Sequence, residues 1–155
     1  YISLVPEDGA VLMHLASGVR GVEAFVRSLP PEKLTTPHAP GEWTVQDILQ
    51  HIADTERVFS YRALRIARGD KTVLPGFDQD DYAANANANA RDLDDLLEEF
   101  QAVRRASIAL ISSFSDELLL RRGSWSGGPL SVRGAVYIIT GHPLYHIASI
   151  FQNYC

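Results

Sequence analysis

The chain has 155 residues, 46% of them hydrophobic and 21% charged, which is typical of one soluble globular domain spanning 1–155. The net charge is −5 at pH 7 with no run of basic residues, which argues against a nucleic-acid partner. No apolar run approaches the roughly 20 residues that cross a bilayer, so we expect no membrane partner. The only cysteine, Cys155, allows no internal disulfide, which favours a reducing compartment, the cytoplasm.

Two long helices are expected in the first half of the chain. Apolar residues recur every three or four positions over residues 7–29, and Pro6 followed by two acids is typical of a helix start. The same periodicity predicts a second helix over residues 44–68. Thr44 and Asp47 have the spacing of a capping box, which places the start of that helix.

The second half of the chain indicates two more long helices. Residues 71–91 contain the tract AANANANA, which we expect to be a loop leading into a short helical piece, because alanine favours helix and no large apolar side chain gives a strand a face. Apolar stripes then predict helices over 92–114 and 131–153, the last with Ser131 as its N-cap. Between them, residues 121–129 are interpreted as a polar, glycine-rich connection.

Four long amphipathic helices and no convincing strand indicate an all-α protein. The most economical arrangement is a four-helix bundle with one long crossover between the second and third helices. The last helix carries more apolar positions than one interior seam requires, Tyr137, Ile138 and Ile139 among them, so we also expect a homodimer.

Three histidines are candidate metal ligands. His142 and His146, in the segment GHPLYHI, are four residues apart within the apolar stripe of the last helix, a spacing that lets two imidazoles bind one ion. Two core histidines hydrogen-bonded to neighbours would produce the same pattern. His51, at the edge of the apolar face of the second helix, is the candidate third ligand, although a half-exposed helix histidine is the alternative. Three imidazoles leave one coordination position open, as in catalytic zinc-type sites. His14 and His38 have no partner at ligand spacing.

The segments GEWTVQDILQHIADTER and LSVRGAVYIITGHPLYHI resemble the DinB-like, or YfiT-like, family of metalloenzymes, from about Pro30 to the end of the chain. The most specific parts are Trp43–Thr44, the His51 segment, and the pair His142 and His146. The resemblance implies an up-down-down-up four-helix bundle, often dimeric, with a divalent metal, nickel or zinc, on these three histidines. Characterised members are transferases and isomerases that use low-molecular-weight thiols such as bacillithiol or mycothiol.

We therefore expect a metal-dependent enzyme, a thiol-dependent S-transferase or isomerase acting on a small electrophilic substrate. Asp54, close to His51 on the same side of the helix, is the candidate catalytic residue, either orienting the ring or acting as a base, with a solvated helix face as the alternative. Arg62 and Arg65 could bind an anionic cosubstrate, or pair with acids at the surface. A non-catalytic, stress-related dimeric module and a metal-dependent hydrolase stay open as alternatives.

One residue departs from the family pattern. Pro143 follows His142, where relatives often carry a helix-friendly residue. Proline has no N–H and pushes on the carbonyl of the residue four positions earlier, so a kink is expected. A local break of the helix at this point would turn His142 and His146 off their common face. Three aromatic residues, Trp43, Trp125 and Tyr145, are candidates for lining a pocket or for packing alone.

Overall fold

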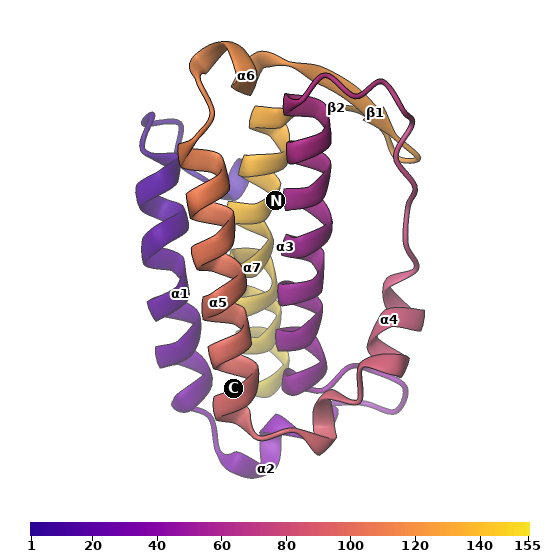
Figure 1. The fold of residues 1–155 in the computed structure, drawn as a ribbon. Coiled ribbons are helices and arrows are strands. Elements are labelled where there is room, and N and C mark those ends of the chain that lie inside the picture. The colour runs from indigo at the N-terminus through magenta and orange to yellow at the C-terminus, as the bar shows by residue number, and fades with distance from the viewer.

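Four long helices pack side by side in the computed structural model, which describes residues 1–155 (Figure 1). They are α1 (Val11–Arg27), α3 (Val45–Ala67), α5 (Leu93–Ser112) and α7 (Val132–Tyr154). The α3 and α5 helices run parallel to each other and opposite to α1 and α7, so the order is up-down-down-up. The prediction of an all-α four-helix bundle is therefore confirmed. None of the helices combines the length and the hydropathy that a membrane span needs.

Side-chain caps fix the starts of the two helices that carry the histidines. At the start of α3, Thr44 Oγ1 accepts a hydrogen bond from the Asp47 N–H (3.1 Å), and Asp47 Oδ2 accepts one from the Thr44 N–H (3.0 Å). This is the predicted capping box. At the start of α7, Ser131 Oγ accepts from the Gly134 N–H at 2.9 Å, as predicted for an N-cap.

The first helix begins later than predicted. It starts at Val11 rather than at residue 7, because Gly9 has a φ of 75°, a left-handed conformation that interrupts a right-handed helix. Asp8 Oδ1 accepts a hydrogen bond from the Ala10 N–H at 2.9 Å. The acid that was expected in the first helical turn therefore closes a turn just before the helix.

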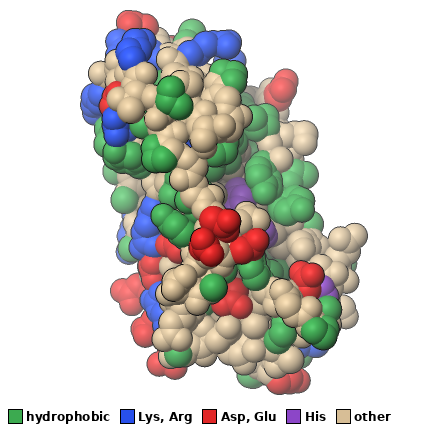
Figure 2. Space-filling view, turned by 90° about the vertical axis from the view of Figure 1, so that its right-hand side faces the viewer, with side chains coloured by type: hydrophobic (Ala, Val, Ile, Leu, Met, Phe, Trp, Pro, Cys, Tyr) green, Lys and Arg blue, Asp and Glu red, His purple; other side chains and the backbone are tan.

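The crossover from α3 to α5 extends along one side of the bundle (Figure 1). It carries the helix α4 (Gln79–Ala86) and the 3₁₀ helix η2 (Ala88–Ala90), which agrees with the expected loop and short helical piece. Asn87 joins them in the left-handed conformation, with a φ of 53°. Figure 2 shows this side of the molecule in space-filling form.

A small β-hairpin corrects the expectation of an irregular connection without strands. The strand β1 (Arg122–Trp125) pairs antiparallel with β2 (Gly128–Ser131), and Trp125 lies opposite Gly128. The Ser-Gly pair between the strands is a two-residue hairpin turn, a signal present in the sequence. Leu74 of the crossover forms an isolated bridge to Trp125, so the hairpin holds the crossover to this end of the bundle.

Three short helical elements complete the fold. They are the 3₁₀ helix η1 (Ile2–Leu4), α2 (Pro31–Leu34) between α1 and α3, and α6 (Asp116–Leu120) between α5 and the hairpin. The η1 segment packs on α7, which brings the start of the chain next to the middle of the last helix.

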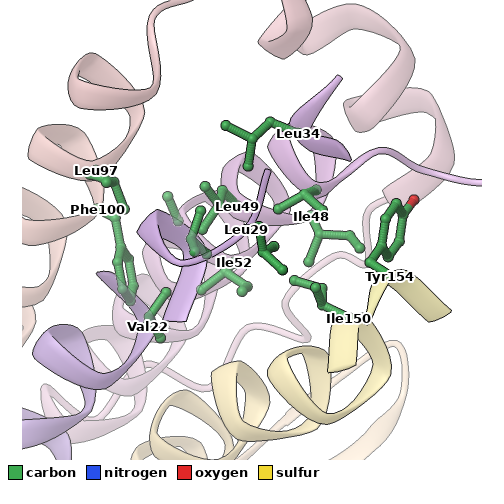
Figure 3. Packing of buried hydrophobic residues seen from close by; sticks show 13 residues of the cluster. Val22, Leu29, Leu34, Ile48, Leu49, Ile52, Leu97, Phe100, Ile150 and Tyr154 are labelled. Carbon is green, nitrogen blue, oxygen red and sulfur yellow. The ribbon is translucent and has the colours of Figure 1, made fainter. Parts of the chain in front are cut away.

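Two apolar clusters hold the two ends of the bundle together. In the first, Val22, Ile52, Phe100 and Ile150 of the four long helices point toward one another (Figure 3). The second joins the opposite helix ends; its members include Leu15, Phe59, Ile111 and Ile139. Burying each such side chain contributes about 1.5–3 kcal/mol. The clusters therefore supply most of the stabilisation without any help from a bound ion.

A layer of buried polar side chains separates these clusters. Its members are Thr55, Glu56, Arg104, Ser107, Thr140 and His142. Within it, the Arg104 guanidinium donates to both carboxylate oxygens of Glu56 at 2.8–3.0 Å and to the Leu15 carbonyl at 2.6 Å. That ion pair is fully hydrogen-bonded, as a buried charge must be. One of the candidate metal ligands, His142, belongs to this layer.

Candidate metal centre

Three histidines from two helices converge next to the polar layer, to which His142 belongs. His51 on α3 and His142 on α7 have their Nε2 atoms 3.1 Å apart, and the Nε2 atoms of His146 and His142 are 3.0 Å apart. One ligand atom from each residue lies within 4.8 Å of the other two. Ligands at about 2.0–2.1 Å from one ion are separated by roughly 2.9–3.4 Å, depending on the coordination angle. The distances from His142 to His51 and to His146 fall within that range, and the remaining pair of ligand atoms, on His51 and His146, lies within 4.8 Å.

Hydrogen bonding among the rings accounts for only one of the two short contacts with good geometry. The Nε2 atom of His142 faces the Nε2 atoms of both His51 and His146. A neutral imidazole nitrogen carries either one hydrogen or one lone pair, so it forms a single good hydrogen bond in the ring plane. At most one of the two contacts is therefore a well-aligned hydrogen bond in the metal-free protein. A cation at the centre would satisfy all three lone pairs, so the donor set fits a divalent metal.

The electrostatics of the cluster favour neutral rings. Burial lowers the pKa of His51 to about 4. Burial and the neighbouring His51 lower the pKa of His146 to about 4, and burial together with both other rings lowers the pKa of His142 to about 2. All three imidazoles are thus uncharged at pH 7, which is the form that binds metal. No carboxylate offsets these shifts.

Aromatic side chains surround the cluster. The Trp43 ring lies 4.7 Å from the His51 ring, measured between centres, and the Tyr145 ring lies 5.3 Å from that of His146. The Tyr1 ring meets His142 edge-on at 4.9 Å. Two of the three aromatic residues named from the sequence therefore line the site. Tyr1 was not foreseen, because nothing local in the sequence signals that the chain start packs there.

One ring of the cluster is partly exposed, and histidine side chains are visible on the side of the molecule that carries the crossover. His51 and His142 are 6% and 3% exposed, whereas His146 is half-buried. Figure 2 shows histidine side chains at the middle of this face, with hydrophobic side chains on either side and acidic ones beside them. The half-buried ring of His146 is therefore the part of the cluster that contacts solvent.

Asp54, the candidate catalytic residue, makes its hydrogen bonds elsewhere. Its Oδ1 accepts from the Gln50 side chain at 3.2 Å and from Arg57 at 3.0 Å, and none of its hydrogen bonds goes to His51. The ring nitrogen Nδ1 of His51 instead lies 3.5 Å from the hydroxyl of Thr55, one helical turn further along α3. Sequence reasoning missed Thr55, although its i+4 spacing from His51 was visible.

Pro143 does not separate the two histidines of α7. The helix is continuous from Val132 to Tyr154, with the proline inside it. The 3.0 Å distance between the Nε2 atoms of His142 and His146 shows that both rings share one face. The other two histidines lie outside the cluster: His14 contacts Asp8 at 2.8 Å, and His38 is exposed.

The two arginines further along α3 have different surroundings. Arg65 pairs with Asp70, as expected of a surface arginine. Arg62 is only 1% exposed and forms no ion pair, which corrects the expectation that it lies at the surface. Trp125, the third aromatic residue named from the sequence, packs on Arg62 rather than on the histidines.

Two bacterial relatives resemble the chain over most of its length. One from Geobacillus thermodenitrificans, named "Putative metal-dependent hydrolase", is 27% identical over 152 residues, which cover 96% of this chain and 83% of the relative. A second with the same kind of name, from Oceanobacillus iheyensis, is 25% identical over 127 residues, or 81% of this chain and 72% of the relative.

Solved structures share the fold, and a family model matches the chain. YfiT from Bacillus subtilis, described as "a probable metal-dependent hydrolase with an unusual four-helix bundle topology", has a TM-score of 0.84 at 18% identity, covering 96% of this chain and 87% of YfiT. A mycothiol-dependent maleylpyruvate isomerase has a TM-score of 0.73 at 10% identity, covering 95% of this chain and 61% of the isomerase. The family model for the DinB superfamily matches residues 15–150. The chain therefore belongs to the DinB superfamily.

Proposed function

We propose that the chain is a metal-dependent enzyme that binds one divalent ion, nickel or zinc, through His51, His142 and His146 and acts on a small-molecule substrate. The observation that carries the proposal is the convergence of three neutral imidazoles, two of them buried and one half-buried, whose ligand atoms lie within 4.8 Å of one another. The names of the two bacterial relatives support metal dependence independently. Three imidazoles are acceptable ligands for several first-row metals, so the choice between nickel and zinc rests on the family resemblance.

The favoured reaction is thiol-dependent transfer or isomerisation. When bound, a divalent ion lowers the pKa of a thiol or a water molecule beside it. The chain itself supplies no carboxylate next to the histidines that could take a proton from water, because Asp54 is hydrogen-bonded to Gln50 and Arg57. A thiol has an ordinary pKa of about 8.5 and needs no such base. Trp43 and Tyr145 would line the approach to the histidines and restrict water there.

Hydrolysis is the second candidate function. The relatives from Geobacillus thermodenitrificans and Oceanobacillus iheyensis are both named as hydrolases and align with most of this chain. In that case water would take the place of the thiol, and proton removal would fall to solvent or to the substrate.

One set of assays separates the candidates. Protein loaded with nickel or zinc is incubated with an electrophilic aryl halide and with an activated ester, each with and without an added small thiol. We expect turnover that depends on the thiol and is absent in the His142→Ala variant. Ester turnover without thiol, also lost in that variant, would support the hydrolase. Stoichiometric metal without turnover of either substrate would support a non-catalytic module.

A further inference from the structure

Arg62 is a buried cation without an acidic partner. Its side chain is 1% exposed, and its Nη2 donates to the Pro75 carbonyl at 2.8 Å. Its Nε and Nη1 atoms are buried and have no hydrogen-bond partner. The guanidinium lies 4.0 Å from the centre of the Trp125 ring and 4.7 Å from that of Phe59. Aromatic faces stabilise a cation by about 0.5–2 kcal/mol, but they do not replace hydrogen bonds in the guanidinium plane.

Other arginines show that this is an exception within the chain. Arg104, equally buried, is bonded to both oxygens of Glu56 and to a backbone carbonyl. Arg57 and Arg65 each pair with an acid at the surface. An unpaired buried charge costs several kcal/mol, so a retained one needs an explanation. Burial also lowers the pKa of Arg62, the direction expected for a cation that lacks a counter-charge.

A pocket of about 300 Å³ adjoins this arginine, between α3 and the crossover. The lining residues of this pocket, here called the crossover pocket, are Arg57, Val58, Tyr61, Arg62, Leu74, Pro75, Gly76, Phe77 and Tyr82. Most of them are apolar or aromatic. Arg57 is already neutralised by Asp54 and Glu99, so Arg62 is the one lining charge without a partner.

We propose that the crossover pocket binds the carboxylate of a small organic acid with an apolar body, and that Arg62 is its counter-ion. The single free charge matches one carboxylate, to which a guanidinium binds strongly. The apolar walls match the rest of such a ligand, and the volume is at the lower end of the range for small-molecule sites. The Pro75 carbonyl, the only present hydrogen-bond partner of Arg62, is the contact that the carboxylate would replace or supplement.

The crossover pocket is separate from the histidine cluster. Arg62 lies eleven residues after His51 on α3, which is about 16 Å along the helix axis. A carboxylate bound at Arg62 therefore does not touch the histidine nitrogens. Binding of a carboxylate in the crossover pocket can therefore be tested independently of the metal site.

The two tryptophans allow the crossover pocket to be tested alone. Trp43 contacts His51 and Trp125 contacts Arg62, so in a Trp43→Phe background the tryptophan emission, excited selectively over the tyrosines, comes only from Trp125 beside the arginine. Metal-free protein is titrated with 3-phenylpropanoate and, separately, with its uncharged amide at constant ionic strength. We expect the acid to change the Trp125 emission and to bind at least tenfold more tightly than the amide.

Two variants and a control decide the role of the arginine. Arg62→Met removes the charge but keeps much of the buried volume, and should fold at least as well, because it removes an unpaired buried charge. It should weaken binding of the acid at least tenfold. Arg65→Met removes one charge from the same helix, at a surface ion pair, and should leave the affinity unchanged.

A second variant guards against indirect effects of the arginine change. Val58→Phe should fill the crossover pocket, because Val58 lines it, and abolish binding of the acid while Arg62 is kept. The proposal would be overturned by equal affinity for acid and amide, by Arg65→Met weakening binding as much as Arg62→Met, or by unchanged binding in Val58→Phe.

Discussion

At the scale of single residues, the candidate metal centre depends on a contact that differs from the one expected. The Nδ1 atom of His51 lies near the Thr55 hydroxyl, at 3.5 Å, while Asp54 bonds to Gln50 and Arg57. A hydrogen-bond partner on the far side of a ligating ring fixes its tautomer and orientation. Whether Asp54 or Thr55 does this for His51 can be measured.

We predict that Thr55→Val lowers the metal affinity up to about tenfold, because the ring of His51 loses its orienting partner. The Asp54→Asn variant should leave the affinity unchanged and reduce the free energy of unfolding by less than about 1 kcal/mol, since it weakens only a surface ion pair. Competition with a chelator measures both affinities. A loss of metal affinity in Asp54→Asn with no loss in Thr55→Val would instead assign the orienting role to Asp54.

The convergence of the histidines was predictable from their spacing, whereas their environment was not. His142 and His146 repeat at the helical period, and His51 lies on a helix expected to pack against theirs, so helix geometry alone suggested one site. The unpaired state of Arg62 could not be read from the sequence, because it depends on which acids reach it in three dimensions. The contact between the rings of Tyr1 and His142 could not be read from the sequence either, because it joins distant parts of the chain.

At the scale of elements, the N-terminal segment η1 can approach α7 closely because residue 141 is glycine. A Cβ atom there would lie 2.2 Å from the carbonyl oxygen of Tyr1 and 3.2 Å from a side-chain carbon of Val5. Tyr1, which directly precedes η1, carries the ring that contacts His142. The absence of a side chain at Gly141 therefore allows Tyr1 to pack beside His142 in the candidate metal centre.

We predict that Gly141→Ala displaces η1 from α7. The backbone amides of Leu4 and Val5, which donate to the carbonyls of Tyr1 and Ile2, should exchange with solvent at least tenfold faster. The control is Gly21→Ala on α1, where a Cβ meets nothing within 4 Å. That change should leave those amides unaffected and stabilise the protein by about 1 kcal/mol through helix propensity. Unchanged exchange in Gly141→Ala would contradict the close approach.

The long helices followed from the sequence because each carries an apolar stripe that must be buried. The predicted starts of α3 and α7 were correct because Thr44 and Ser131 are recognisable capping residues. The predicted start of α1 was wrong because it depends on the left-handed backbone conformation of Gly9, which the apolar pattern does not show. The hairpin over residues 122–131 was missed because its strands are only four residues long and show no alternating pattern. Its Ser-Gly turn was the only signal, and the pairing with Leu74 depends on tertiary contacts.

At the scale of the whole molecule, two apolar clusters stabilise the bundle, and the three histidines lie in or next to the polar layer between them. Because the three histidines are held uncharged in the folded protein, the free energy of unfolding depends on pH. In the unfolded chain each imidazole has a pKa near 6.5, whereas in the folded protein the pKa is about 4 for His51 and His146 and about 2 for His142. Below pH 6.5 the unfolded state therefore binds protons that the folded state does not.

We predict that the free energy of unfolding of the metal-free protein is unaffected by these groups above pH 7 and falls as the pH drops from 6.5 toward 4. Each histidine contributes at most about 1.4 kcal/mol per pH unit in that window. Denaturant unfolding at constant ionic strength measures the slope. In the His142→Gln variant, the part of this slope that the three histidines contribute should be about a third smaller. A slope that is the same in both proteins would show that the cluster is not held neutral.

The homodimer stays a prediction. Large hydrophobic side chains are exposed on several elements, including Leu12 and Met13 of α1 and Phe151 of α7. Light scattering at micromolar concentration should give the mass of two chains, and a monomer under those conditions would refute the dimer.

The metal content of untagged protein is the most direct test of the central claim, that His51, His142 and His146 bind one divalent ion. Elemental analysis after dialysis should find about one nickel or zinc ion per chain in the wild type. It should find less than about a tenth of that in each single His→Ala variant, with helicity retained because the apolar clusters persist. The matched controls His14→Ala and His38→Ala should keep the full content. Equal metal in all five variants, or none in a wild type supplied with both metals, would contradict the account.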